Sequence, residues 1–205
     1  MLILNLTKSE AGQYPAIQPY SGPEIPEGYA WWPDGLDRTT FDQYQGFVEL
    51  EVARGTVVSC QPNQPAFEAW QAEQLAARKV ERIAESKAQL SDYLLCHPMQ
   101  WTDGQSYAIT TDKQQQLTSK IMSATLAAQT GQPYTLTWNA TGEVCQPWTL
   151  ENLTALAFAI DARVTALVTY QQTQEVAMRE AATVAALEAI VVDYDSVPLA
   201  GGETA

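Results

Sequence analysis

The sequence predicts an α+β fold, because the residue composition and pattern of the 205-residue chain change twice along its length. Residues 1–62 are rich in proline, glycine and aromatic residues, which favour strands and extended segments. A run without glycine or proline then follows Pro65, as is typical of a helix. We therefore expect a small N-terminal β module with an extended arm, a long connecting helix, and a C-terminal module of two hairpin–helix units.

The N-terminal β module is predicted over residues 1–62. The opening "MLILN" indicates a first strand, because its apolar run is too short for a secretory signal and no positive charge precedes it. The runs "GFVELEV" and "GTVVSC" predict two strands joined by a tight turn at Arg54–Gly55. In the stretch before these strands, five prolines are incompatible with a helix: Pro15, Pro19, Pro23, Pro26 and Pro33. Such an arm buries little of its own surface, so we expect it to lie on another protein.

The connecting helix is predicted over residues 63–96, with Asn63 as its N-cap and Pro65 in its first turn. About 30 residues at about 1.5 Å each give about 45 Å, which exceeds the width of a small domain. The helix is therefore expected to connect two parts of the chain. Its apolar stripe, which Lys87 interrupts, favours packing on a neighbour or a short coiled coil and consists of Ala69, Ala72, Ala76, Val80, Ile83, Leu90 and Leu94.

The C-terminal module is predicted over residues 97–194, where one pattern occurs twice. Each unit has a strand, a turn with glycine, a second strand and a helix that begins at a threonine. The turns are Asp103–Gly104 and Thr141–Gly142, and the caps are Thr110 or Thr111 in the first unit and Thr149 in the second. The second helix has the clearest buried face, with Leu153, Leu156, Ile160, Val164 and Leu167. A short last helix is expected in "TVAALEAIVVDY", and residues 195–205 are predicted to be a tail.

The charge balance argues against several classes of partner. The net charge is -13, from 24 acidic and 11 basic residues, whereas a nucleic-acid-binding protein needs a basic surface for the phosphates. We therefore expect no nucleic-acid partner. The mean hydropathy is -0.20 and no continuous apolar run reaches the roughly 18 residues of a membrane span, so no membrane insertion is expected.

The only histidine, His97, lies next to Cys96 and shortly before Asp103. A cysteine nucleophile needs a base within hydrogen-bond distance, but side chains of adjacent residues point apart. Pro98 also favours an extended conformation at His97, as expected where a helix ends. We interpret His97 as a residue at the C-terminus of the connecting helix, where a positive charge is favourable.

The sequence predicts neither an enzyme nor a cofactor site. The three cysteines, Cys60, Cys96 and Cys145, are far apart and form no motif of metal ligands. No nucleophile-elbow, phosphate-loop, dinucleotide, zinc-protease or calcium-loop motif occurs. Two acidic pairs, Asp34 with Asp37 and Asp193 with Asp195, are interpreted as solvated surface residues rather than as a glycosidase pair.

Aromatic residues on the arm are the candidate binding residues. Exposed aromatic side chains on a proline-rich segment are typical anchors in a partner protein. The alternative is a carbohydrate-binding module, in which Trp31 and Trp32 would stack on sugar rings. The predicted partner-binding residues are Tyr29, Trp31, Trp32, Phe41 and Tyr44.

Residues 75–194 resemble an uncharacterised domain of tailed-bacteriophage tail-fibre and baseplate proteins. The resemblance rests on "HPMQWTDGQSYAITTDKQQQLTSKI", then "LTWNATGEVCQPWTLENLTALAFAIDARVTALV", then "ALEAIVVDY". The opening "IPEGYAWWPDGLDRTTFDQYQGFVELEV" is similar to the openings of phage tail-tip proteins. That family has no assigned catalytic residues, so the resemblance implies none here.

The resemblance implies a structural component of a phage tail, in the baseplate or the tail fibre. It implies other tail proteins as partners, a homo-oligomer with a trimer as one option, and a place in the virion after synthesis in the host cytoplasm. Two alternatives stay open. One is a tail-fibre assembly chaperone, and the other is the carbohydrate-binding adhesion module.

Overall fold

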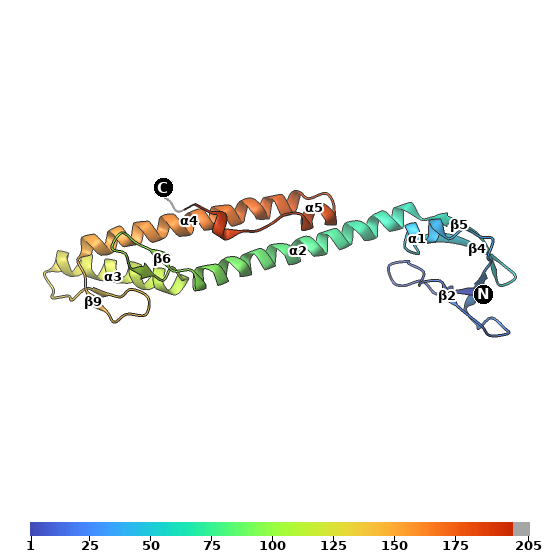
Figure 1. The fold of residues 1–205 in the computed structure, drawn as a ribbon, viewed down its shortest axis with the longest axis horizontal. Coiled ribbons are helices and arrows are strands. Elements are labelled where there is room, and N and C mark those ends of the chain that lie inside the picture. Colours follow the sequence, from blue (N-terminus) through green and yellow to red (C-terminus); the bar gives the residue numbers. More distant parts are fainter. Residues whose placement is uncertain (199–205) are drawn as a thin grey trace. The chain divides into compact units, whose positions relative to one another are not determined.

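The computed structural model describes residues 1–198, and the chain divides into two compact units, Met1–Ala77 and Arg78–Ala205. Figure 1 shows the ribbon coloured along the sequence. The division falls inside helix α2, Gln64–Cys96, which corresponds to the predicted connecting helix. The first unit contains one sheet and the second consists mainly of helices, so the predicted α+β class is confirmed.

The first unit is built on a five-stranded sheet with the order β2-β1-β3-β5-β4. Strand β1 is antiparallel to both β2 and β3, and β3 joins β5 in parallel where Trp31 is opposite Thr56. The predicted hairpin is present between β4 and β5, with a positive φ of 50° at Arg54 and 72° at Gly55. The five strands are Leu2–Asn5, Gln18–Pro19, Tyr29–Trp32, Val48–Ala53 and Thr56–Pro62.

The proline-rich segment that was predicted to be an extended arm is part of the folded smaller unit. Helix α1, Thr39–Gln43, covers the sheet and contributes Phe41 to a core of apolar side chains. That core also contains Leu4, Ile17, Ala30, Trp32, Val48 and Val57. The segment predicted to be an arm therefore supplies two strands and a large part of the core of this unit.

Helix α2 begins as predicted, because the backbone N–H of Ala66 donates to the Asn63 side chain at 3.2 Å. In the first half of the predicted apolar stripe, Val80 is 70% exposed. Ala69, Ala72 and Ala76 are exposed as well. In the second half, Ile83 is half-buried, and Leu90 and Leu94 pack on the core of the larger unit. For the exposed first half, packing on a neighbour or in a short coiled coil stays a prediction.

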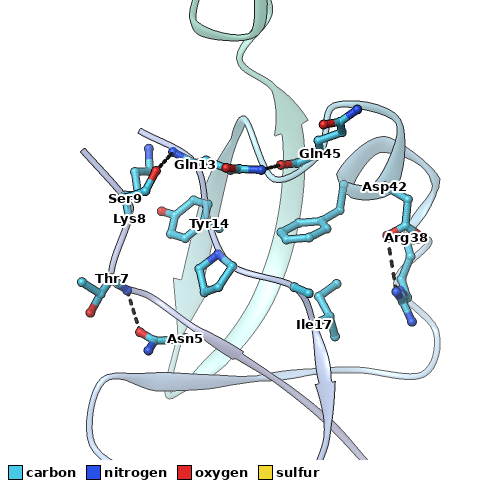
Figure 2. A pocket seen from close by; sticks show the side chains of 13 residues that line it. Asn5, Thr7, Lys8, Ser9, Gln13, Tyr14, Ile17, Arg38, Asp42 and Gln45 are labelled. Carbon is cyan, nitrogen blue, oxygen red and sulfur yellow. Dashed lines mark hydrogen bonds and ion pairs between the residues drawn. The ribbon is translucent and has the colours of Figure 1, made fainter. Parts of the chain in front are cut away.

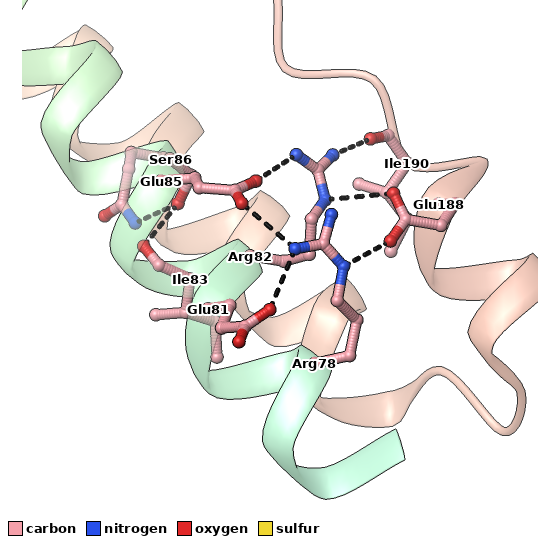
Figure 3. A network of polar contacts seen from close by, with 9 residues as sticks. Arg78, Glu81, Arg82, Ile83, Glu85, Ser86, Glu188 and Ile190 are labelled. Carbon is pink, nitrogen blue, oxygen red and sulfur yellow. Dashed lines mark hydrogen bonds and ion pairs between the residues drawn. The ribbon is translucent and has the colours of Figure 1, made fainter. Parts of the chain in front are cut away.

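A polar network joins α2 to helix α5, Val184–Glu188 (Figure 3). The Arg78 Nε atom lies 2.6 Å from Glu188 Oε1, and Arg82 Nε lies 3.6 Å from Glu188 Oε2. Arg82 also donates to the carbonyl oxygen of Ile190 at 3.0 Å. Lys87, which interrupts the predicted stripe, lies 3.0 Å from Glu175 of helix α4, Leu150–Glu180. The pattern of charges on α2 thus reflects ion pairs within the unit.

The two predicted hairpin–helix units are present in the larger unit. Strands β6, Met99–Gln100, and β7, Ser106–Tyr107, precede helix α3, Thr111–Thr130. Strands β8, Thr137–Trp138, and β9, Gln146–Pro147, precede helix α4, Leu150–Glu180. The side chains of Thr110 and Thr149 cap α3 and α4, so Thr110 rather than Thr111 is the cap of the first unit.

The two hairpins contact each other and contribute side chains to the core of the larger unit. The backbone N–H of Thr141 donates to the carbonyl oxygen of Ser106 at 2.8 Å. The Trp101 and Trp148 rings stack with their centroids 5.7 Å apart. The core beneath them is formed by Met99, Tyr107, Ile109, Leu117, Leu136, Trp138, Leu153, Leu156, Ile160, Leu167, Tyr194 and Val197.

Part of the predicted tail is packed rather than free. Residues Tyr194–Ser196 form a short 3-10 helix, and Val197 is only 8% exposed. The buried Arg163 donates to the carbonyl oxygen of Val197 at 2.7 Å, and a core arginine needs such a partner. The rest of the predicted tail, 199–205, lies outside the described residues.

Helix α4 is long and apolar enough to cross a membrane, judged by length and composition. The core helix of a folded unit meets the same criteria, so this finding is weak support for a membrane span. In this unit α4 carries core side chains on one face and places the buried Arg163 beside the Tyr93 hydroxyl at 3.2 Å.

Candidate binding cleft in the smaller unit

A cleft of about 690 Å³ opens in the smaller unit between the loop before β2 and the turn after helix α1 (Figure 2). Its floor is apolar and includes Tyr14, Pro15, Ile17 and Phe41. Its rim is polar and includes Asn5, Thr7, Lys8, Ser9, Gln13, Arg38, Asp42 and Gln45. A cleft with an apolar floor and a few polar groups at its rim is typical of a binding site.

The loop that forms one wall is held against the turn after α1 by backbone contacts. The backbone N–H of Tyr14 donates to the Gly46 carbonyl at 2.9 Å, and the Gln13 side chain donates to the Gln45 carbonyl at 2.7 Å. Gly46 has a φ of 81°, and an added Cβ there would lie 2.3 Å from the Tyr14 carbonyl oxygen. The cleft therefore depends on a close approach that only glycine permits.

Two basic side chains stand at this cleft, although the smaller unit has only three, Lys8, Arg38 and Arg54. The Lys8 Nζ atom lies 4.8 Å from the centroid of the Tyr14 ring and 3.7 Å from Glu49 Oε1. Arg38 lies 3.3 Å from Asp42, and its Nε atom is buried without a hydrogen-bond partner within residues 1–198. A ligand with an apolar body and a carboxylate could pair with these two side chains in place of Glu49 and Asp42.

Two of the five predicted partner-binding residues are core residues. Trp32 is 2% exposed and Phe41 is 4% exposed, and their rings meet edge-to-face with centroids 5.5 Å apart. The Trp32 indole N–H donates to the Leu36 carbonyl at 3.0 Å. Neither side chain can act as a protruding anchor in this fold. Alternation along strand β3 turns one of the two adjacent tryptophans toward the core, but only the packing of the strand decides that it is Trp32.

The other three predicted residues are partly exposed but do not line the cleft. Trp31 lies against Tyr20 with centroids 5.9 Å apart, and Tyr44 contacts Phe67 at 5.2 Å. Tyr29 accepts a hydrogen bond of 3.4 Å from Asn5. The cleft residues Lys8, Tyr14 and Arg38 were missed, although the scarcity of basic residues in this part of the chain was a signal for two of them.

The structure gives His97 and Asp103 different partners. The His97 ring stacks on Tyr93 at 4.1 Å, and its Nδ1 atom lies 3.1 Å from the Tyr93 carbonyl oxygen at the end of α2. Asp103 accepts hydrogen bonds from the Tyr107 hydroxyl at 2.7 Å and from the Gln105 backbone at 2.9 Å. Within residues 1–198, no three side chains gather in a way that could hold a metal ion.

These observations define a two-unit α+β protein whose smaller unit carries a cleft suited to binding. Residues 69–195 match the family described as "Domain of unknown function (DUF4376)", and the chain belongs to this family. The match begins within α2 and covers almost all of the described part of the larger unit. No curated protein and no solved structure matches the chain.

Proposed function

We propose that the chain is a structural component of a bacteriophage tail, in the baseplate or the tail fibre, and that it acts through protein–protein contacts. The resemblance of residues 75–194 and of the N-terminal opening to phage tail proteins supports this role. In this role the chain is a virion protein that is made in the host cytoplasm and is not an enzyme.

The observation that carries the proposal is the cleft of the smaller unit. Its apolar floor at Tyr14 and Phe41 suits the side chains of an extended segment, and Lys8 and Arg38 suit an acidic residue of that segment. The partner in this proposal is a neighbouring tail protein. A protein ligand is favoured over a carbohydrate because the burial of Trp32 leaves Trp31 without the second ring of the sugar-stacking pair.

The place of the protein in the particle separates a structural subunit from an assembly chaperone. We expect mass spectrometry of purified virions to detect the chain at a constant ratio to a known tail protein. Absence from virions that were assembled in its presence would overturn the structural role in favour of the chaperone.

The role of the cleft is tested by the charge reversal Lys8→Glu. Since Lys8 stands at the cleft and Arg54 lies in the β4–β5 turn, Arg54→Glu is a control with the same change in net charge. We expect Lys8→Glu to lower incorporation into particles about 10-fold or more, which corresponds to about 1.4 kcal/mol of binding free energy, and Arg54→Glu to leave it unchanged. Equal incorporation of both variants would contradict a role for the cleft, provided that both have the wild-type circular dichroism spectrum.

A further inference from the structure

Helices α3 and α4 of the larger unit expose a face without charged side chains. No charged residue occurs in α3 between Ile121 and Thr130, or in α4 from Asn152 to Ile160. Between the two helices lies a groove of about 590 Å³. Among the described residues, the side chains that line this groove are apolar or are those of threonine and glutamine.

Large apolar side chains at the groove are strongly exposed. Phe158 is 72% exposed, Met122 is 68% exposed and Leu126 is 58% exposed. Contiguous exposed apolar side chains of this size usually mark a surface that contacts another molecule. The groove and its rim are therefore a candidate contact surface, which we call the α3–α4 face.

The outer surface of α4 continues this face with a regular spacing. The residues follow one another at alternating steps of three and four, and none of them is charged: Ala155, Phe158, Ala162, Thr165, Thr169, Gln172 and Val176. All of them are exposed except Ala162, which is partly buried. This spacing is that of a helix that packs along another helix, and its small residues permit a close approach.

We propose that the α3–α4 face binds the same face of a second copy of this chain. The charge of the molecule favours this occupant, because two copies with a net charge of -13 repel each other wherever their charged surfaces meet. Contact between copies is least unfavourable at a surface that carries no charge. A partner of another kind would be attracted by its own basic residues to the acidic surface of this chain. An uncharged face offers such basic residues no carboxylate to pair with.

The area of the face suits a weak dimer. The uncharged part of α3 extends over about 15 Å and the stripe of α4 from Ala155 to Val176 over about 33 Å, each with a width of about 10 Å. The face thus measures about 480 Å² on each copy, and burying it twice removes about 1,000 Å², a size found in weak and reversible interfaces.

The arrangement is two-fold symmetric, because each copy presents both an exposed Phe158 and the groove beside it. In such a pair both copies use the same surface, and the four helices form a bundle around the buried aromatic rings. This inference rests on the proposed function in one respect: the dimer would be the contact that a tail component makes between its own subunits. The dimer itself is tested by a separate experiment.

The test compares two substitutions at equally exposed apolar positions. Phe158→Asp places a charge on the face, whereas Val144→Asp places the same charge in the turn between β8 and β9, and both native side chains are 72% exposed. Sedimentation equilibrium at about 100 µM is expected to show a dimer for the wild type and for Val144→Asp, and a monomer for Phe158→Asp. Circular dichroism and thermal unfolding should show that both variants are folded, since neither native side chain belongs to the core.

Three results would overturn the inference. They are a monomeric wild type, association that Phe158→Asp does not weaken, and wild-type protein that binds vesicles of neutral phospholipid through Phe158 but stays monomeric. A dimer that depends on Phe158, together with absence of the chain from virions, would support this inference and refute only the phage-tail role. A chain that is present in virions but monomeric in solution would support the phage-tail role and refute only this inference.

Discussion

At the scale of single residues, Trp31, Trp32 and Gly46 show how the core and the cleft of the smaller unit are formed. Trp31 and Trp32 are adjacent in the sequence but lie on opposite faces of strand β3, so only Trp32 joins the core. Gly46 brings the loop at Tyr14 against the turn after α1. The first effect follows from strand alternation, and the second from a close approach between segments about thirty residues apart.

The two tryptophans are expected to differ in their contribution to stability. Trp32→Ala removes a buried ring and its hydrogen bond to Leu36, which should lower the free energy of unfolding by about 3–5 kcal/mol. Trp31→Ala removes a partly exposed ring and should have a much smaller effect. Urea denaturation followed by circular dichroism measures both, and equal losses would contradict the placement of Trp32 in the core.

Gly46 allows a test of the close approach at the cleft. Gly46→Ala should lower the free energy of unfolding by about 1–3 kcal/mol, because the new Cβ would meet the Tyr14 carbonyl oxygen. Gly12→Ala is the matched control, since Gly12 has a similar φ of 84° but nothing within 4 Å of an added Cβ. A difference between the two variants in denaturant unfolding measures the collision itself, and equal effects would mean that only the positive φ matters.

At the scale of elements, helix α2 shows how polar contacts decide which face of a helix is covered. Its ion pairs with α4 and α5 run through Arg78, Arg82 and Lys87, which reach Glu188 and Glu175. Its apolar contacts with the core come from Leu90 and Leu94, further along the helix. Apolar periodicity does not reveal a helix face that is covered through basic residues. The aliphatic stems of these side chains pack on the neighbouring helix, and their charged ends form ion pairs. The hairpin–helix units were predictable, because their strand, turn and cap signals are local in the sequence.

The pH dependence of the larger unit should report on Glu175. Hydrogen bonds from Arg179, Lys87 and Gln171 lower the pKa of the Glu175 carboxyl to about 2. Because this pKa is depressed from an unfolded value of about 4.3, its contribution to stability is present above about pH 4.3 and is lost as the pH falls toward about 2. The urea midpoint of the wild type should therefore exceed that of Glu175→Gln at neutral pH, and the difference should shrink below about pH 4.3. A difference that does not change with pH would show that the ion pairs do not contribute.

At the scale of the whole molecule, the acidic charge should govern how copies associate. Raising the salt concentration from about 20 mM to about 300 mM shortens the range of the repulsion between copies, so the dimer through the α3–α4 face should become tighter. The proposed pairing of Lys8 and Arg38 with an acidic segment at the cleft of the smaller unit should become weaker over the same range. Sedimentation equilibrium at several salt concentrations measures the first effect, and a dimer that dissociates as salt rises would contradict an uncharged interface.

The sequence by itself determined the elements of this protein: the β4–β5 hairpin, the beginning of α2 at Asn63, the two hairpin–helix units and the buried face of α4. Each of these depends on residues close together in the chain, so its signal is local. Only the tertiary structure decided that Trp32 and Phe41 are core residues, that Lys8, Tyr14 and Arg38 meet at one cleft, and that the uncharged side of α4 is exposed. These facts depend on which distant segments pack together, and an apolar residue looks the same in a sequence whether the fold buries it or leaves it for a partner.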